Sequence, residues 1–269
     1  MQTKSEGRGL KISLRLGDWL FLMLFAAAAA LIFWRCPYGY ASPDESFYPS
    51  IPYRLLLGDA LFVHEWHLTQ LFSFLLYPFV SLFLKINGSL EGIFLADRYL
   101  CAALHCALGL FVYIRLREIS RVGAGAAGLC LTVFVPFNIM SLSYYDGGNV
   151  LLTAALLVLL TARRMRGWQY FLAGLLFAQA VLYNPYLVLL YGIYALWLLW
   201  LSLCPGRRRK WGEGAFTGYA FVRISAGCAV MALLFFVFLF ARESPGSFFL
   251  PCRCCLRTRS TAFPSAKSC

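Results

Sequence analysis

Long apolar runs separated by short clusters of arginine and lysine constrain the fold of this chain more than any other sequence feature. Several runs, at about 17–34, 93–114, 122–140, 168–203 and 218–241, are long enough to cross the hydrocarbon core of a bilayer. Of the 269 residues, 61% are hydrophobic and only 13% are charged. This composition excludes an ordinary soluble domain. We therefore predict an all-α, polytopic membrane helical bundle.

Basic residues predict the orientation of the bundle. The formal net charge is +12, and much of the positive charge lies in short clusters between apolar runs. Such clusters are typical of cytoplasmic loops, so they do not indicate a nucleic-acid partner. The tail at 1–16 and the clusters at 115–121, 163–166 and 207–210 are then cytoplasmic. We expect an integral protein of the plasma membrane with a cytoplasmic N-terminus.

The apolar segment at 68–86 is long enough to span the membrane, but the alternation of charge argues against it. If it crossed, Arg115, Arg117 and Arg121 would lie on the external side, and every later basic cluster would be inverted. Pro78 allows a bend and Lys85 can reach the headgroups. We predict about seven transmembrane helices in a domain at 17–243, with an interfacial or re-entrant helix at 68–86 inside a first external loop at 35–92.

Two connections and the end of the chain complete this topology. The sequence SLSYYDGG at 141–148 is predicted to be an external loop, and Pro185 predicts a turn within the long run at 168–203. The last segment, 244–269, has no helical apolar period and resembles an irregular or frameshifted end. Its cysteines lack the paired spacing of a zinc site, whereas those inside apolar runs, Cys101 among them, are expected to be small buried hydrophobic residues.

An acidic pair, Asp44 and Glu45, follows the first apolar run directly. Carboxylates near hydrocarbon are costly to keep ionised and usually have a function, although the pair taken alone also fits two solvated loop residues. A further carboxylate, Asp146, lies in the predicted external loop at 141–148. The pattern therefore predicts that these acidic side chains lie on the non-cytoplasmic face.

The order of motifs in this region resembles a known family. The acidic pair is followed by Tyr48, Arg54, Gly58-Asp59 and Asp97-Arg98. This order is similar to that of the C-type membrane glycosyltransferases that use lipid-linked sugars, in particular the protein O-mannosyltransferase and aminoarabinose transferase group, glycosyltransferase family 39. The resemblance covers roughly 10–205. It departs from the family where a Lys-Pro-Pro occurs in some members, since this chain has Val-His-Glu-Trp-His at 63–67, and it has fewer spans.

The resemblance implies transfer of a sugar from a polyprenyl-phosphate donor to an acceptor hydroxyl of a glycan, lipid or protein on the external face. Asp44 would act as general base, Glu45 would orient it, and Asp146 would be the second carboxylate of the site. The donor phosphate would be bound by positively charged or hydrogen-bonding side chains, for which the candidates are Arg54, His64, His67 and Arg98.

Alternatives remain open at each of these positions. Arg98 could pair locally with Asp97, Arg54 could contact headgroups, and Asp146 could cap a helix. The sequence predicts no firm cofactor, although His64 and His67 with Asp44 could bind a divalent metal. The chain could also be an inactive, truncated remnant of such an enzyme, or a polytopic transporter or flippase.

Overall fold

The computed structural model describes residues 16–39, 44–63, 67–161, 166–203 and 216–242. His64, Glu65 and the cysteine-rich segment at 244–269 lie outside these ranges. Within them, the regular elements are helices, which confirms the all-α prediction. Six helices are long and apolar enough to cross a membrane. The chain is therefore a polytopic helical membrane protein.

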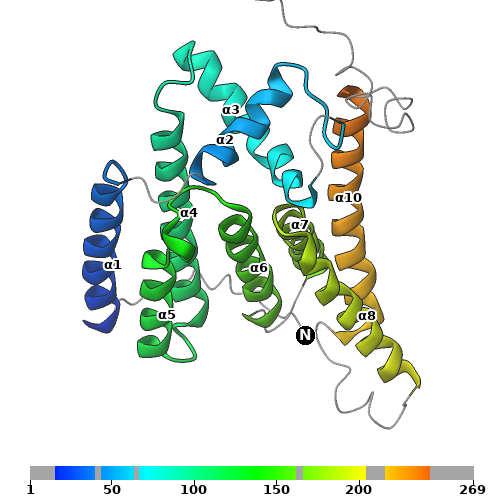
Figure 1. Cartoon of the computed structure of the whole chain (residues 1–269). Helices are drawn as coiled ribbons and strands as arrows, with labels where there is room; N and C mark the ends of the chain where they lie inside the picture. Colours follow the sequence, from blue (N-terminus) through cyan, green and yellow to red (C-terminus); the bar gives the residue numbers. More distant parts are fainter. Residues whose placement is uncertain (1–15, 40–43, 64–66, 162–165, 204–215, 243–269) are drawn as a thin grey trace, which may run out of the picture.

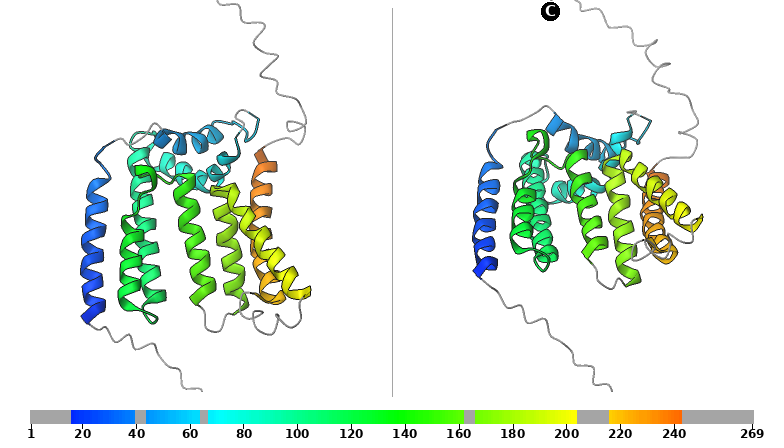
Figure 2. Two further views of the ribbon diagram at one scale, coloured as in Figure 1. Left: turned by 60° about the horizontal axis from the view of Figure 1, so that its bottom comes forward. Right: turned by 90° about the horizontal axis from the view of Figure 1, so that it is seen from below.

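Seven helices run side by side with alternating direction and form the bundle (Figures 1 and 2). They are α1 (Leu16–Arg35), α4 (Ile93–Leu116), α5 (Arg121–Val133), α6 (Tyr144–Thr161), α7 (Gly167–Tyr183), α8 (Val188–Leu203) and α10 (Gly218–Arg242). The shortest of them are α5 with 13 residues and α8 with 16, and α6 and α7 are not among the six candidate spans. The first residues of α1, α5, α7 and α10 and the last residues of α4, α6 and α8 share one end of the bundle (Figure 2). Successive bundle helices thus run in opposite directions, as the order of the basic clusters predicts.

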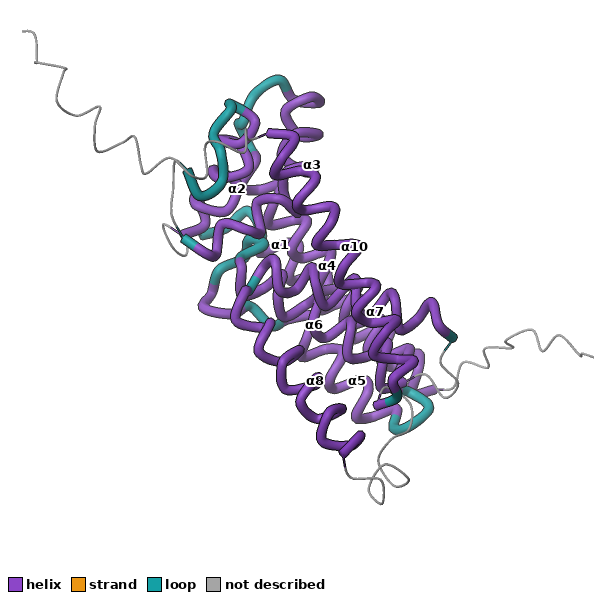
Figure 3. The backbone as a smooth tube through the Cα atoms, turned by 90° about the vertical axis from the view of Figure 1, so that its right-hand side faces the viewer, coloured by secondary structure: helices purple, strands orange, loops and turns teal. Residues whose placement is uncertain are grey.

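Three further elements, α2 (Asp44–Leu56), the short turn η1 (Leu68–Leu71) and α3 (Phe72–Asn87), lie across the other end of the bundle, here called the α2 end (Figure 2). Two more short turns, η2 (Pro136–Asn138) and η3 (Pro185–Leu187), follow α5 and α7. Figure 3 shows the same arrangement from the side, with α2 and α3 together at one end. The segment at 68–86 thus forms η1 and most of α3, so it is helical as predicted, while its placement in an external loop stays a prediction. Its length and composition would also allow it to cross a membrane, since Thr69–Asn87 is one of the six candidate spans.

The helix α2 lies within the loop predicted at 35–92, where the sequence predicts a helix only at 68–86. Two prolines inside it, Pro49 and Pro52, remove backbone donors and disfavour a helix. The helix nevertheless forms because one face is buried. Tyr48, Ile51 and Leu55 belong to the same apolar cluster as Phe72 of α3. Tertiary burial here outweighs local propensity.

The boundaries near 140 also differ from the prediction. The helix α5 ends at Val133, before Pro136, which limits helical continuation. The predicted loop at 141–148 is half helical, since α6 begins at Tyr144. The Ser143 hydroxyl accepts a hydrogen bond from the Asp146 N–H at 3.1 Å and thereby caps this helix. Asp146 therefore lies in the first turn of a helix.

Two glycines bring α7 and α10 into backbone contact. A Cβ atom at Gly174 would lie 2.0 Å from the carbonyl oxygen of Ile224, and one at Gly227 would lie 2.1 Å from that of Phe171. Small residues allow this close approach between membrane helices, where van der Waals packing drives association. The pairing of α7 with α10 therefore depends on the absence of side chains at these two positions.

Candidate functional site

A buried ion pair joins α2 to α4 at the α2 end. The Arg98 guanidinium donates from Nε to Glu45 Oε2 at 3.1 Å and from Nη2 to the same oxygen. Its Nη1 donates to the carbonyl oxygen of Cys36 at 2.9 Å, and the other oxygen of Glu45 accepts from the Met140 N–H at 3.3 Å. Glu45 is 1% exposed and Arg98 7%. These bonds compensate for the cost of burying both charges.

Asp97 does not pair with its sequence neighbour Arg98. Its Oδ2 accepts from the Leu142 N–H at 3.2 Å, while Oδ1 is buried without a hydrogen bond to the described residues. Successive residues on a helix point about 100° apart, so the two side chains face different partners. The local Asp97–Arg98 pair considered from the sequence is replaced by the longer-range contact with Glu45.

Asp44 lies in the first turn of α2, directly before Glu45, and its side chain is exposed. Tyr48, one turn further along α2, is buried. Burial, and then the negative charge of Tyr144 and Asp44, raises the pKa of Tyr48 above its ordinary value, although a hydrogen bond with Ser143 opposes the shift. Asp44 is thus at the surface, one turn before Tyr48, whose ring lies 6.1 Å from that of Tyr144 in α6.

A small polar cavity adjoins Glu45, the second residue of the acidic pair. It has a volume of about 90 Å³ and is lined by Glu45, Arg98 and residues that follow α1 and α5. Arg35 contributes a second guanidinium, which donates to the side chain of Asn138 at 2.5 Å. Arginine is well suited to bind phosphate, because its planar group offers several donors. The cavity therefore combines two cationic side chains with a neighbouring exposed carboxylate. Its lining residues are Arg35, Tyr38, Gly39, Glu45, Arg98, Asn138 and Met140.

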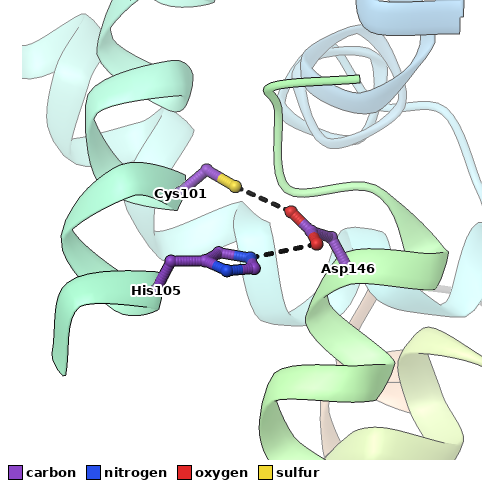
Figure 4. A group of neighbouring side chains, drawn as sticks. All are labelled: Cys101, His105 and Asp146. Atoms are coloured by element: carbon purple, nitrogen blue, oxygen red, sulfur yellow. Dashed lines mark hydrogen bonds and ion pairs between the residues drawn. The ribbon is translucent and has the colours of Figure 1, made fainter. Parts of the chain in front are cut away.

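Asp146 is buried and belongs to a second polar cluster, with Cys101 and His105 of α4 (Figure 4). The Cys101 thiol donates to Asp146 Oδ2 at 2.8 Å, and His105 Nε2 lies 3.0 Å from Asp146 Oδ1. The other ring nitrogen of His105 lies 2.8 Å from the carbonyl oxygen of Leu131. Arg98 lines both the cavity beside Asp146 and the cavity beside Glu45, so the two clusters are neighbours.

The other residues predicted for the donor phosphate lie elsewhere. Arg54 pairs with Asp59 at 2.6 Å. It lies about 15 Å from Asp44 along α2, at 1.5 Å per residue. His67 bonds the Thr69 hydroxyl at 2.7 Å, and its ring lies 5.0 Å from that of Phe47, one turn from Asp44. His64 is outside the described residues. The structure thus brings Glu45 and Arg98 together but places Arg54 at the far end of α2.

Four residues of these clusters, Arg35, Cys101, His105 and Ser143, are not among the predicted site residues. The sequence predicts Cys101 only as a small buried hydrophobic residue. Cys101 is buried as expected, but its thiol is bonded to Asp146. The spacing Cys101-x₃-His105 places two potential ligands on one helix face, and Ser143-x-x-Asp146 is a capping pattern. These two signals were available before the fold was known.

Searches against protein-family models, curated proteins and solved structures found no match to this chain.

Proposed function

We propose that this chain is a membrane glycosyltransferase that moves a sugar from a polyprenyl-phosphate donor to an acceptor hydroxyl. The reaction takes place at the α2 end, which we assign to the external face of the plasma membrane. The observation that carries the proposal is the polar cavity lined by Arg35, Glu45 and Arg98, together with the exposed carboxylate of Asp44, the residue before Glu45. Transfer from a phosphate leaving group needs positive charge at the leaving group and a base at the acceptor, and the two arginines and Asp44 offer these groups.

In this reaction, the Asp44 carboxylate takes the proton of the acceptor hydroxyl. The acceptor oxygen then forms a bond to the anomeric carbon of the sugar as the bond from that carbon to the phosphate oxygen breaks. The electron pair leaves with the polyprenyl phosphate. Arg35 and Arg98 stabilise the charge that develops on this leaving group.

Glu45 has a positioning role in this scheme. Its carboxylate is held by Arg98 and by the Met140 N–H, which fixes the first turn of α2 against α4. Asp44 is the preceding residue, so its backbone is fixed by the same contacts. The exposed side chain of Asp44 then faces an acceptor that arrives from the aqueous phase.

The test is sugar transfer in membranes containing the full chain, with a panel of radiolabelled polyprenyl-phosphate sugars. We expect Asp44→Asn to lower the rate by about 10²- to 10⁴-fold, the usual contribution of a general base. The thermal unfolding temperature should not change, because Asp44 is exposed. The matched control is Asp59→Asn, which removes another α2-region carboxylate, the partner of Arg54, away from the cavity.

Two outcomes would overturn the proposal. Transfer that is unaffected by Asp44→Asn removes the assigned base. An absence of transfer from every donor in the panel, with a folded chain in the membrane, favours an inactive remnant of such an enzyme.

One observation favours a second function, transport across the membrane. His105 lies about 18 Å from the start of α4 at 1.5 Å per residue, near the middle of this 24-residue helix. Buried ionisable groups at this depth often mark a path for ions or substrates. A transporter would move solute or lipid in proteoliposomes, and Asp44→Asn would leave that flux unchanged.

A further inference from the structure

Three atoms that commonly bind metals converge between α4 and α6. They are the Cys101 sulfur, the His105 Nε2 and a carboxylate oxygen of Asp146, and they all lie within 4.8 Å of one another (Figure 4). The three side chains are buried, with exposed fractions of 4%, 5% and 1%. Cys101 and His105 are four residues apart on α4, so they project from the same face of the helix.

The hydrogen bonds of His105 leave a place for a cation. A backbone carbonyl only accepts, so the Nδ1 atom of His105 carries the proton that is donated to Leu131. In a neutral imidazole, Nε2 then has a lone pair, and it faces Asp146 Oδ1, which is also an acceptor when ionised. Two acceptors 3.0 Å apart require a shared positive species. A proton or a metal ion satisfies this requirement.

The surroundings have the features of a metal site. Histidine ligands usually donate their second ring N–H to a carbonyl or carboxylate, as His105 does to Leu131. The Asp146 backbone is fixed by the Ser143 cap. A cavity of about 10 Å³ adjoins all three side chains, which is close to the space for one water molecule as a fourth ligand.

We propose that Cys101, His105 and Asp146 bind one Zn²⁺ ion that links α4 to α6. A sulfur, a nitrogen and an oxygen ligand suit this borderline-soft ion, and a thiolate with a carboxylate balances its charge inside the protein. Binding widens the S–O and N–O separations from 2.8 and 3.0 Å to about 3.3–3.5 Å, the distances between ligands around tetrahedral zinc. The site is independent of the proposed transferase activity.

The experiment uses the full chain in detergent, purified without a metal column and washed with chelator. Zinc is added back to one sample, which is desalted before its zinc content is measured by mass spectrometry, and cobalt(II) is added to a second sample as a spectroscopic substitute for zinc. We expect one equivalent of zinc per chain and a thiolate-to-cobalt charge-transfer band in the near ultraviolet. Because this band needs a cysteine ligand, the wild-type chain alone can refute the proposal by showing neither band nor zinc.

Variants locate the site. Cys101→Ser and Asp146→Asn should lower zinc affinity by more than the about 10- to 100-fold loss that follows removal of an outer-shell partner. Cys106→Ser is the matched control, since it changes another cysteine of α4 outside the cluster. A second control changes Cys252, Cys254 and Cys255 to serine together, and it tests whether these tail cysteines bind the zinc.

Zinc should also raise the thermal unfolding temperature of the wild type and of both controls, but not of Cys101→Ser or Asp146→Asn. This readout depends on binding and not merely on the folding of each variant. Zinc that persists unchanged in Cys101→Ser, or that is lost with the tail cysteines, would overturn the assignment.

Discussion

Arg98 pairs with Glu45, 53 residues earlier in the chain, and not with its neighbour Asp97. This contact fastens the first turn of α2 to α4. It also neutralises one member of the acidic pair and leaves the other, Asp44, exposed at the α2 end. Two adjacent carboxylates thus have different environments, because one faces the interior of the protein and the other faces outward.

The buried ion pair gives a first prediction. Glu45→Gln leaves the Arg98 charge buried without its counter-ion, so we expect a loss of about 3–5 kcal/mol in the free energy of unfolding. The double variant Glu45→Leu with Arg98→Leu should lose less, because no charge remains to be desolvated. Thermal unfolding in detergent measures both. Glu91→Gln, at an exposed position, is the control and should behave as the wild type. Equal losses in the single and double variants would contradict this account.

The contact between α7 and α10 gives a second prediction. Gly174→Val introduces atoms where the Ile224 carbonyl oxygen lies, and overpacking of this kind costs about 1–3 kcal/mol or more. Gly192→Val is the matched control, because a Cβ at this position in α8 meets nothing within 4 Å. We expect a lower unfolding temperature for the first variant only. A similar decrease in both would indicate helix propensity and not close packing as the cause.

The two ends of the bundle give a third prediction. Asn87 is the last residue of α3, and Arg117 directly follows α4. The helix α4 has 24 residues and is therefore about 36 Å long at 1.5 Å per residue. Asn87→Cys should be labelled by an impermeant thiol reagent from outside intact cells. Arg117→Cys should be labelled only after the membrane is permeabilised. Both are compared with the parent chain. Labelling of both residues from the same side would exclude the seven-span arrangement.

Tyr48 gives a prediction for alkaline pH. Its pKa is raised in the folded protein, chiefly by burial, so the unfolded chain ionises first, near pH 10. The stabilisation is complete below that pH and is lost as pH rises, by at most about 1.4 kcal/mol per pH unit. Tyr48→Phe should therefore show a smaller decrease in unfolding temperature between pH 9 and 11 (~1 unit on each side of the tyrosine value) than the wild type does. Tyr38→Phe, at an exposed position, should match the wild type. An equal decrease in all three proteins would refute the role of Tyr48.

The sequence by itself determined the class of the fold and most of the helices. Apolar runs and a proline predicted α1, α4, α7, α8 and α10 with boundaries close to the observed ones. This was possible because the hydropathy and length of a run can be read from the run itself. The sequence also predicted a helix at 68–86 outside the series of alternating spans, and α3 lies across the α2 end (Figure 2). That this end is external stays a prediction.

Only the tertiary structure decided which side chains meet. The helix α2 forms despite two prolines because its buried face packs against α3. Glu45 pairs with Arg98, and Asp146 contacts Cys101 and His105. These pairings depend on how each helix is rotated about its axis and on which helices lie side by side. The sequence gives the spacing of residues along one helix. It does not show which face of a neighbouring helix lies opposite, and the buried polar groups pair across that interface.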